Sequence, residues 1–176
     1  YSIQAIDKLD AAFDQVIFIP GNHDEYYRDK RDFNSIAWLK NYPNIRIFND
    51  ITVEGDVAVV PWLVGEEHKK IKKLNAKYMI GHLELPHFYM NAMVQMPDTG
   101  ELQDTDLQGI EHVFTGHFHK RQTRGNVTYM GNAFPHNYSD AWDDDRGAMI
   151  LDWGKDPQYV AWPNAPKYKT LKLGQL

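Results

Sequence analysis

Apolar residues stand at helical spacing at the beginning of the chain. Ile3, Ile6, Leu9 and Phe13 follow one another at intervals of three or four positions, which is the period of one face of an α-helix. The pattern therefore predicts an opening helix that ends before Asp14.

Three short apolar runs then predict buried strands, and each is followed by a glycine and by chemically versatile side chains. The runs are residues 16–19, 77–80 and 112–115. The first is rich in β-branched residues, which is typical of a strand covered on both faces. The segments that follow the three runs are Gly21-Asn22-His23-Asp24, Gly81-His82 and Gly116-His117-Phe118-His119.

The remaining pattern alternates between helix and strand. A helix over about residues 34–41 is expected to begin at Asn34 or Ser35 and to turn Trp38 and Leu39 inward. The further strands expected are residues 45–48, 51–53 and 57–60, which read as a meander, and residues 127–130, 148–152 and 159–162, with a hairpin turn at Gly125-Asn126. This mixture predicts an α/β sandwich in a single domain over residues 1–176, with several strand ends gathered at one edge.

The composition narrows the chemistry that this fold can carry. The chain has no cysteine, so thiolate metal sites and a cysteine nucleophile are excluded, and any metal must be held by nitrogen and oxygen. The 19 Lys and Arg against 24 Asp and Glu give a formal net charge of −5, which neither supports nor excludes DNA binding. No apolar run is long enough to span a membrane, and we expect an intracellular protein without membrane contact.

One run of lysines has an ordinary structural explanation. Four lysines between residues 69 and 73 follow Glu66 and Glu67. Acidic residues at the start of a helix and basic residues near its end both suit the helix dipole. We therefore expect a solvated helix face there.

The polar residues after the three apolar runs form the candidate site. The carboxyl ends of strands that share a direction lie at the same edge of a sheet, so Asn22, His82, His117 and His119 are expected to converge. Amide oxygen and neutral imidazole suit Mn²⁺, Fe²⁺ or Zn²⁺ better than Ca²⁺ or Mg²⁺. Two such ions activate water and clamp the attacking and leaving oxygens of a phosphoryl group. His23 is then the candidate to stabilise the transition state or to protonate the leaving oxygen.

Each of these residues also has a simpler reading. Asp24 either orients His23 or caps the turn that follows it, and the cap is the more ordinary role. A histidine taken alone is more often a core or surface residue than a ligand. His87, His112 and His136 are for this reason expected to lie outside the site. The run of three aspartates at residues 143–145 reads as a like-charged loop that faces water, with Arg146 pairing with it.

The three segments resemble three of the five signature motifs of the calcineurin-like metallophosphoesterases, in both order and spacing. Within that superfamily the chain is similar to phage recombination nucleases of the SbcD type. The similarity includes the stretches "GHLELPHFYM", "TGHFHKRQTRGNVTYMGN" and "DDDRGAMILDW". It extends from Val16 to about Pro166.

The resemblance implies a fold, a site and a set of partners. The fold is the calcineurin-like sandwich of two mixed β-sheets flanked by helices. Asn22, His82 and His117 would bind one metal, His119 would belong to the other, and His23 would be the catalytic imidazole. The cofactors would be two divalent ions, with Mn²⁺ preferred. The partners would be DNA and an SMC-type ATPase subunit, a homodimer is left open, and the location would be the cytoplasm of the infected host cell.

The same resemblance predicts an incomplete site. The family's first two motifs, an Asp-x-His and a Gly-Asp, would stand before Tyr1 and have no counterpart here. The chain is therefore expected to be a fragment truncated at its N-terminus, with an incomplete second metal site. The function expected is hydrolysis of DNA phosphodiester bonds, and two alternatives stay open: a phosphomonoesterase or small-nucleotide phosphodiesterase of the same fold, and an inert fragment.

Overall fold

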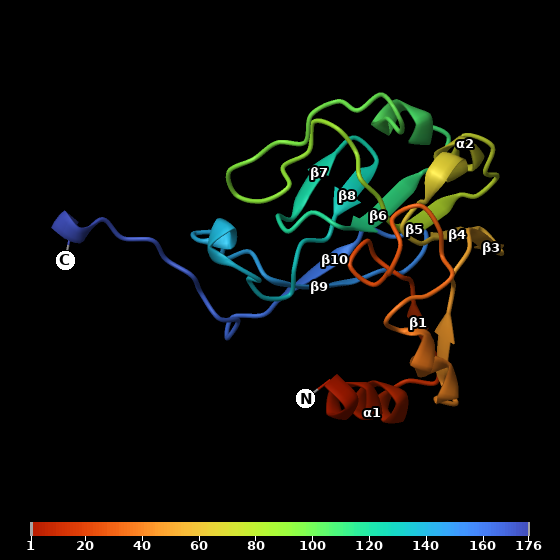
Figure 1. The fold of residues 1–176 in the computed structure, drawn as a ribbon, viewed down its shortest axis with the longest axis horizontal. Helices are drawn as coiled ribbons and strands as arrows, with labels where there is room; N and C mark the ends of the chain where they lie inside the picture. The colour runs from red at the N-terminus through yellow and green to blue at the C-terminus, as the bar shows by residue number, and fades with distance from the viewer. Residues whose placement is uncertain (1, 176) are drawn as a thin grey trace. The chain divides into compact units, whose positions relative to one another are not determined.

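The computed structural model describes residues 2–175, which form two compact units, Tyr1–Leu83 and Glu84–Leu176. Each unit combines short strands with short helices (Figure 1). This α/β content agrees with the class expected. The calcineurin-like sandwich and the single domain over residues 1–176 stay predictions.

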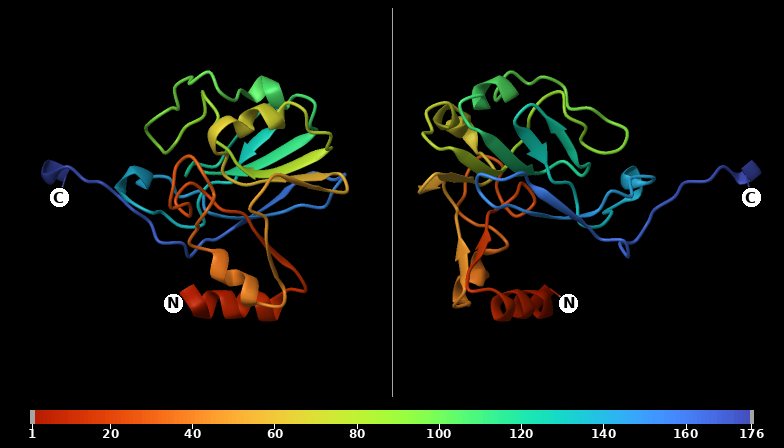
Figure 2. Two further views of the ribbon diagram at one scale, coloured as in Figure 1. Left: turned by 45° about the vertical axis from the view of Figure 1, so that its right-hand side comes forward. Right: turned by 180° about the vertical axis from the view of Figure 1, so that it is seen from behind.

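The first unit begins with a helix and holds five strands. Its elements are α1 (Ser2–Ala12), β1 (Val16–Phe18), the 3-10 helix η1 (Ala37–Asn41), β2 (Ile45–Ile47), β3 (Thr52–Glu54), β4 (Val57–Val60), η2 (Gly65–Glu67), α2 (His68–Ile71) and β5 (Tyr78–His82). Strand β4 pairs antiparallel with β3 and parallel with β5, while β1 and β2 form a separate parallel pair. The predicted opening helix is confirmed, and Figure 2 shows α1 beside η1.

Hydrogen bonds join α1 to the segment that leads into β2. The Tyr42 hydroxyl donates to Asp7 Oδ1 at 2.8 Å, and the Asn44 backbone N–H donates to Asp10 Oδ1 at 2.9 Å. The Asn44 carbonyl in turn accepts from Val16 N at 2.8 Å. These bonds fix the entry into β1, the strand that leads to the Asn22 segment.

Three details of the first unit correct the sequence predictions. Strand β1 is not covered on both faces, because its sheet has two strands and Ile17 is 44% exposed. The segment 45–48 is not part of a meander, since β2 pairs parallel with β1. The antiparallel pairing of β3 with β4 is confirmed.

The expected helix over residues 34–41 is shorter and lacks the expected cap. It is the 3-10 helix η1, whose N-cap is Ile36. No side chain caps this helix, because it begins after Ile36 and so leaves Asn34 and Ser35 one or two positions before the N-cap. The Ser35 hydroxyl donates instead to Asp24 Oδ1, and the Asn34 amide donates to Asn49 Oδ1. Leu39 is buried as expected, whereas Trp38 is 40% exposed.

The second unit carries two further groups of strands. Its elements are η3 (Asp104–Leu107), β6 (His112–Gly116), β7 (Gln122–Arg124), β8 (Val127–Tyr129), η4 (Tyr138–Asp140), β9 (Gly147–Ile150), β10 (Gln158–Ala161) and η5 (Leu173–Gln175). Strand β8 pairs parallel with β6 and antiparallel with β7, and β9 pairs antiparallel with β10. Gly125 takes a φ of +58° in the β7–β8 turn, which confirms the hairpin predicted there.

Buried apolar residues of β6 and of the segment after it form part of the core of the second unit. Val113 and Phe114 are buried in β6, and Phe118 is buried between His117 and His119. The Phe118 ring stacks on Tyr129, with ring centroids 4.6 Å apart. Packing of Phe118 therefore anchors the segment that carries both imidazoles.

The chain after β10 folds back on the segment 142–144. The Trp142 backbone N–H donates to the Tyr168 carbonyl at 3.0 Å, and the Trp142 indole donates to Thr170 Oγ1 at 3.1 Å. Lys169 Nζ lies 2.8 Å from Asp144 Oδ2 and 4.4 Å from the centre of the Trp142 ring. These contacts dock the C-terminal segment, referred to below as the tail (residues 163–175).

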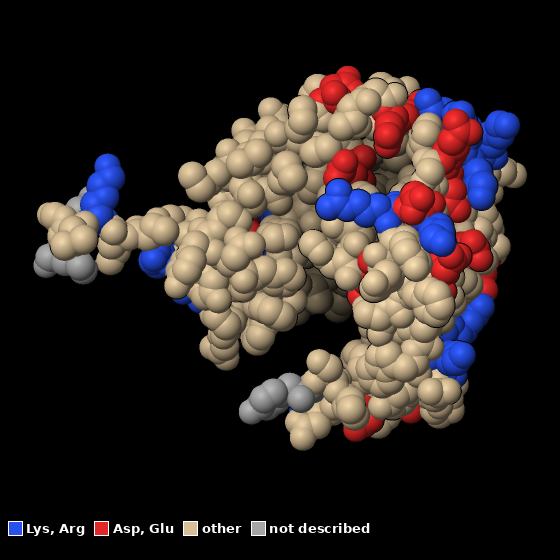
Figure 3. Space-filling model, viewed as in Figure 1, with Lys and Arg blue, Asp and Glu red and all other residues tan. Residues whose placement is uncertain are grey.

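Charge on the face around α2 is mixed. Figure 3 shows basic and acidic side chains interleaved there. Lys69 pairs with Glu66, and Lys70 pairs with Glu67. This agrees with the solvated face expected from the sequence. Among the described residues, no helix has the length and apolarity needed to cross a membrane.

Candidate functional site

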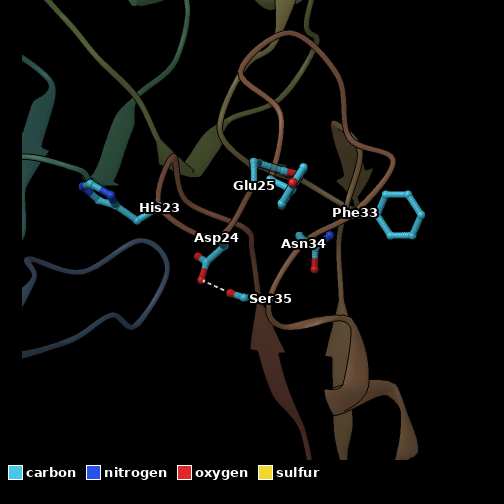
Figure 4. Close-up of a pocket in the computed structure, with 7 residues that line it drawn as sticks. His23, Asp24, Glu25, Phe33, Asn34 and Ser35 are labelled. Atoms are coloured by element: carbon cyan, nitrogen blue, oxygen red, sulfur yellow. Dashed lines mark hydrogen bonds between the residues drawn. The ribbon is translucent and has the colours of Figure 1, made fainter.

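The turn that follows β1 is held by the Asp24 carboxylate. Its Oδ2 accepts a hydrogen bond from Gly21 N at 2.8 Å, and its Oδ1 accepts from the Ser35 hydroxyl at 2.9 Å. Figure 4 shows the His23 ring pointing away from this carboxylate. The structure thus gives Asp24 the turn-capping role, and its participation in catalysis stays a prediction.

Asn22 and His82 meet although sixty residues separate them. His82 Nε2 lies 3.0 Å from Asn22 Oδ1. His82 is the last residue of β5, and the exit of β1 is tied to the segment after β4 by a bond from Trp62 N to the Pro20 carbonyl at 2.9 Å. Two of the four predicted ligands therefore lie together in the first unit.

Gly21 is required by the close approach of the His82 ring. A Cβ atom at residue 21 would lie 2.8 Å from His82 Cε1, a separation shorter than any ordinary contact between these atoms. The structure therefore shows that Gly21 makes room for an imidazole.

His23 is exposed beside a pocket of about 340 Å³. The pocket is lined by His23, by the polar residues Asp24, Asn34 and Ser35, and by others of the 24–35 segment (Figure 4). An exposed imidazole next to a pocket is able to exchange a proton with a bound molecule. This is the environment that the predicted role of His23 requires.

A buried cluster of charges supports the loop that carries this pocket. Arg31 forms ion pairs with Glu67 and with Glu25, and Arg31 Nη1 lies 3.7 Å from Glu25 Oε1. Burial raises the pKa of Glu25, although Arg31 opposes the shift. Burial also acts to raise the pKa of Glu67, but hydrogen bonds from Val64 N–H and Arg31 outweigh it and lower that pKa. The Arg31 guanidinium thus faces two carboxylates whose pKa values are shifted in opposite directions.

His117 has an unusual backbone in the second unit. Its φ is +93°, which is rare for a residue with a side chain and is concentrated at functional positions. Its Nε2 lies 3.0 Å from Glu84 Oε2. The ring therefore faces a carboxylate that the sequence analysis did not single out, two residues after His82.

His119 contacts a buried carboxylate as well. Its Nδ1 lies 2.9 Å from Oδ1 of Asp140 and 3.2 Å from Oδ2. The His136 backbone N–H also donates to Asp140 Oδ2, at 2.8 Å. Burial acts to raise the pKa of Asp140, but the hydrogen bonds from His136 and His119 outweigh it and hold the pKa below its ordinary value.

The backbone of His119 is fixed from several sides. Its N–H donates to the Met90 carbonyl at 2.8 Å, and its carbonyl accepts from Asn132 N at 3.0 Å. Arg146, 2% exposed, donates to the same carbonyl at 3.1 Å. Gly131 has a φ of +72°, and a Cβ there would lie 3.0 Å from that carbonyl oxygen. Hydrogen bonds and close packing together locate His119.

The aspartate run 143–145 is paired with cations. Asp144 pairs with Lys169, Asp145 with Arg121 at 2.6 Å, and Asp143 with Arg146 at 3.4 Å. The pairing expected for Arg146 is confirmed. The expectation that all three carboxylates face water is wrong for Asp143, whose side chain is 9% exposed.

The candidate residues carry oxygen and nitrogen atoms of the kinds that bind divalent cations. In the structure these residues lie together two at a time. Asn22 with His82 offers an amide oxygen and an imidazole, and His119 with Asp140 is the carboxylate–histidine arrangement common behind metal ligands. Within residues 2–175, no group of three or more His, Cys, Asp or Glu side chains is arranged to hold an ion. The convergence of His117 and His119 with Asn22 and His82 stays a prediction.

Sequence reasoning missed Glu84 and Asp140, and it did not foresee the bond from Arg146 to the His119 carbonyl. Glu84 stands in the quoted "GHLELPHFYM" stretch, so its proximity to a candidate ligand was a usable signal. Asp140 stands shortly before the aspartate run 143–145, and the sequence does not distinguish it from those residues. Its role depends on a contact across 21 residues, for which the sequence contains no periodic signal.

Comparison with known proteins gives one informative similarity. No known protein-family profile matches the chain. The chain is 29% identical over 161 residues to Exonuclease subunit 1 of Enterobacteria phage T4. The aligned part is 86% of this chain and 46% of the phage protein, so the chain spans about half the length of that relative.

Proposed function

We propose that this chain is a metal-dependent nuclease that hydrolyses DNA phosphodiester bonds with the chemistry of calcineurin-like metallophosphoesterases. The observation that carries the metal-dependent chemistry is the meeting of Asn22 Oδ1 with His82 Nε2 at 3.0 Å. The similarity to a phage T4 protein named as an exonuclease subunit supports DNA as the substrate. That name also supports work within an assembly of several chains.

In this proposal the ligands are Asn22, His82, His117 and His119. Mn²⁺ is the preferred ion, and two bound divalent ions would activate water and neutralise charge on the phosphate. Gly21 leaves space for the His82 ring, and Phe118 anchors the segment that carries His117 and His119. These residues orient the donors before any substrate binds.

His23 acts as the proton donor to the leaving oxygen. Its ring is exposed beside the pocket and is free of the Asp24 carboxylate, which is engaged with Gly21 and Ser35. Asp24 shapes the turn that presents the imidazole.

Hydrolysis of linear duplex DNA in the presence of Mn²⁺ tests the proposed function. We expect the chain to release nucleotides, and His82→Ala to lower the rate by at least about 100-fold, because even residues behind metal ligands are worth 10- to 100-fold. Asp98→Asn is the matched control, since its carboxylate serves a local turn with Gly100 and Gln103. Equal cleavage by the wild-type chain and the His82 variant would contradict the proposal.

A substrate panel separates the proposed function from its closest rival. Phosphomonoesters and small nucleotide diesters are offered beside duplex DNA under the same conditions. Hydrolysis of the small substrates without cleavage of DNA would support the phosphomonoesterase or small-nucleotide alternative, because substrate choice depends on the loops around a shared site.

A further inference from the structure

Asp140 is an acid with two defined hydrogen-bond partners. It ends η4 and is 1% exposed. Its Oδ2 accepts from the His136 backbone N–H at 2.8 Å, and its Oδ1 lies 2.9 Å from His119 Nδ1. A backbone N–H is an obligatory donor, so the oxygen that faces it must be an acceptor.

The other oxygen selects the form of the His119 ring. A neutral imidazole has one N–H and one acceptor nitrogen, and the hydrogen bond made by one nitrogen determines which is which. A carboxylate oxygen 2.9 Å from Nδ1 favours the proton on Nδ1. The lone pair is then on Nε2, and the His119 side chain is 26% exposed.

Hydrogen bonds of the main chain at His119 limit the positions that its ring can take. The His119 N–H and carbonyl are both engaged, with Met90, Asn132 and Arg146. The remaining freedom is rotation of the side chain, which the contact with Asp140 restricts. Position and protonation of His119 are therefore set by the same carboxylate.

We propose that Asp140 is a positioning residue that holds His119 as the Nδ1–H tautomer and so directs the Nε2 lone pair at a divalent cation. This inference rests on the proposed function for the identity of the ion, and on the contacts of Asp140 for the state of the ring. Asp140 itself does not touch the ion.

The isosteric change Asp140→Asn tests this inference sharply. The amide oxygen of the new side chain is needed by the His136 N–H, so its NH₂ group would face His119 Nδ1. Nδ1 must then become the acceptor, and the proton moves to Nε2. The variant keeps the size of the side chain and reverses the tautomer.

The experiment uses the 176-residue chain without metal, at mildly alkaline pH, in two measurements. Nitrogen-15 NMR of the histidine rings, with His119 assigned by comparison with His119→Gln, reports which nitrogen carries the proton. Calorimetric titration with Mn²⁺ reports affinity. Asp98→Asn is again the control, because it makes the same carboxylate-to-amide change at a turn of the same unit.

We expect a proton on Nδ1 in the wild-type chain and in the control, and on Nε2 in Asp140→Asn. We expect Mn²⁺ affinity to fall by about 10- to 100-fold in that variant alone. A wild-type His119 with its proton on Nε2 would overturn the inference, and this measurement decides even if the variant fails to fold. Unchanged Mn²⁺ affinity in a folded Asp140→Asn chain would overturn it too.

The same data keep this inference apart from the proposed function. Normal Mn²⁺ binding and the expected tautomers, combined with no cleavage of DNA, would count against the nuclease and support the role of Asp140. Cleavage of DNA and Mn²⁺ affinity that both stay unchanged in Asp140→Asn would support the nuclease and count against the role of Asp140.

Discussion

Single residues in this protein make close contacts that allow little substitution. Gly21 is the clearest example, because a Cβ at this residue would lie only 2.8 Å from the His82 ring. His117 is another, since its φ of +93° is sustained by the surrounding structure. Both residues adjoin a candidate ligand or are one.

We expect Gly21→Ala to displace the His82 ring and to separate it from Asn22. The added methyl group forces a local shift that costs about 1–3 kcal/mol in the free energy of unfolding. Urea denaturation measures that cost, and Mn²⁺ titration measures the loss of the ligand pair. Gly109→Ala is the control, because a Cβ at residue 109 has nothing within 4 Å. Equal stability and affinity in both variants would contradict the reading of Gly21.

The Asp24 carboxylate also has a measurable local role. Asp24→Ala removes the acceptor for both Gly21 N and the Ser35 hydroxyl. Loss of a capping carboxylate costs about 0.5–2 kcal/mol. We expect reduced stability of the loop, measured by hydrogen exchange at Gly21 and Ser35, while Asp24→Asn retains part of the protection. Full protection in the alanine variant would exclude the capping role.

At the scale of elements, the ion pair of Arg31 with Glu67 joins the 21–35 loop to η2, and Glu25 in the same loop also faces Arg31. Glu67 has a lowered pKa, so its ionised form stabilises the fold at pH values above its ordinary pKa of 4.5, and this contribution is lost as the pH falls through the folded value. Glu25 has a raised pKa, so its ionised form opposes folding at neutral pH.

Replacing each of these two glutamates by glutamine should therefore change the free energy of unfolding in opposite directions at neutral pH. We expect Glu67→Gln to cost about 1–3 kcal/mol, because Arg31 loses a charged hydrogen-bond partner. We expect Glu25→Gln to be neutral or stabilising. Urea denaturation from pH 7 down to about pH 4 should show both differences shrinking as the carboxyl groups become protonated. A larger loss in Glu25→Gln than in Glu67→Gln would refute this account.

Elements also show what the sequence was able to predict. The apolar runs at 77–80 and 112–115 and the Gly125 hairpin carry strong local signals, and the strands β5 and β6 and the hairpin formed there. The caps proposed for η1 failed because the helix begins at Ala37 with Ile36 as its N-cap, so Asn34 and Ser35 lie before the capping position. The pairing of β2 with β1 was missed because alternation predicts a strand and says nothing of its partner.

The sequence predicted part of the candidate site. The meeting of Asn22 with His82 followed from two strand ends, each marked by a glycine. The partners Glu84 and Asp140 could not be found in this way, because single carboxylates are common and only the folded chain brings them to His117 and His119. Motif residues were visible in the sequence, and the residues that orient them were not.

On the scale of the whole molecule, bound metal should stabilise the folded chain. A ligand at 100 times its dissociation constant adds about 2.7 kcal/mol, which raises the melting temperature of a chain of this size by about 5–10 °C. We expect this rise with Mn²⁺ and its reversal by a chelator. The double variant Asn22→Ala, His82→Ala should show a smaller rise. An identical rise in that variant would mean that the ion binds elsewhere.

The contact of the tail with residues 142–144 should depend on salt concentration. Lys169 and Asp144 are more than one-third exposed, so dissolved electrolyte weakens their attraction, whereas the bonds of Trp142 to Tyr168 and Thr170 are much less affected. Trypsin should therefore cut after Lys169 sooner in concentrated sodium chloride than in dilute buffer, while cleavage after the distant Lys8 keeps its pace. At high salt concentration, residues 163–175 would therefore separate from residues 142–144 more readily than in dilute buffer.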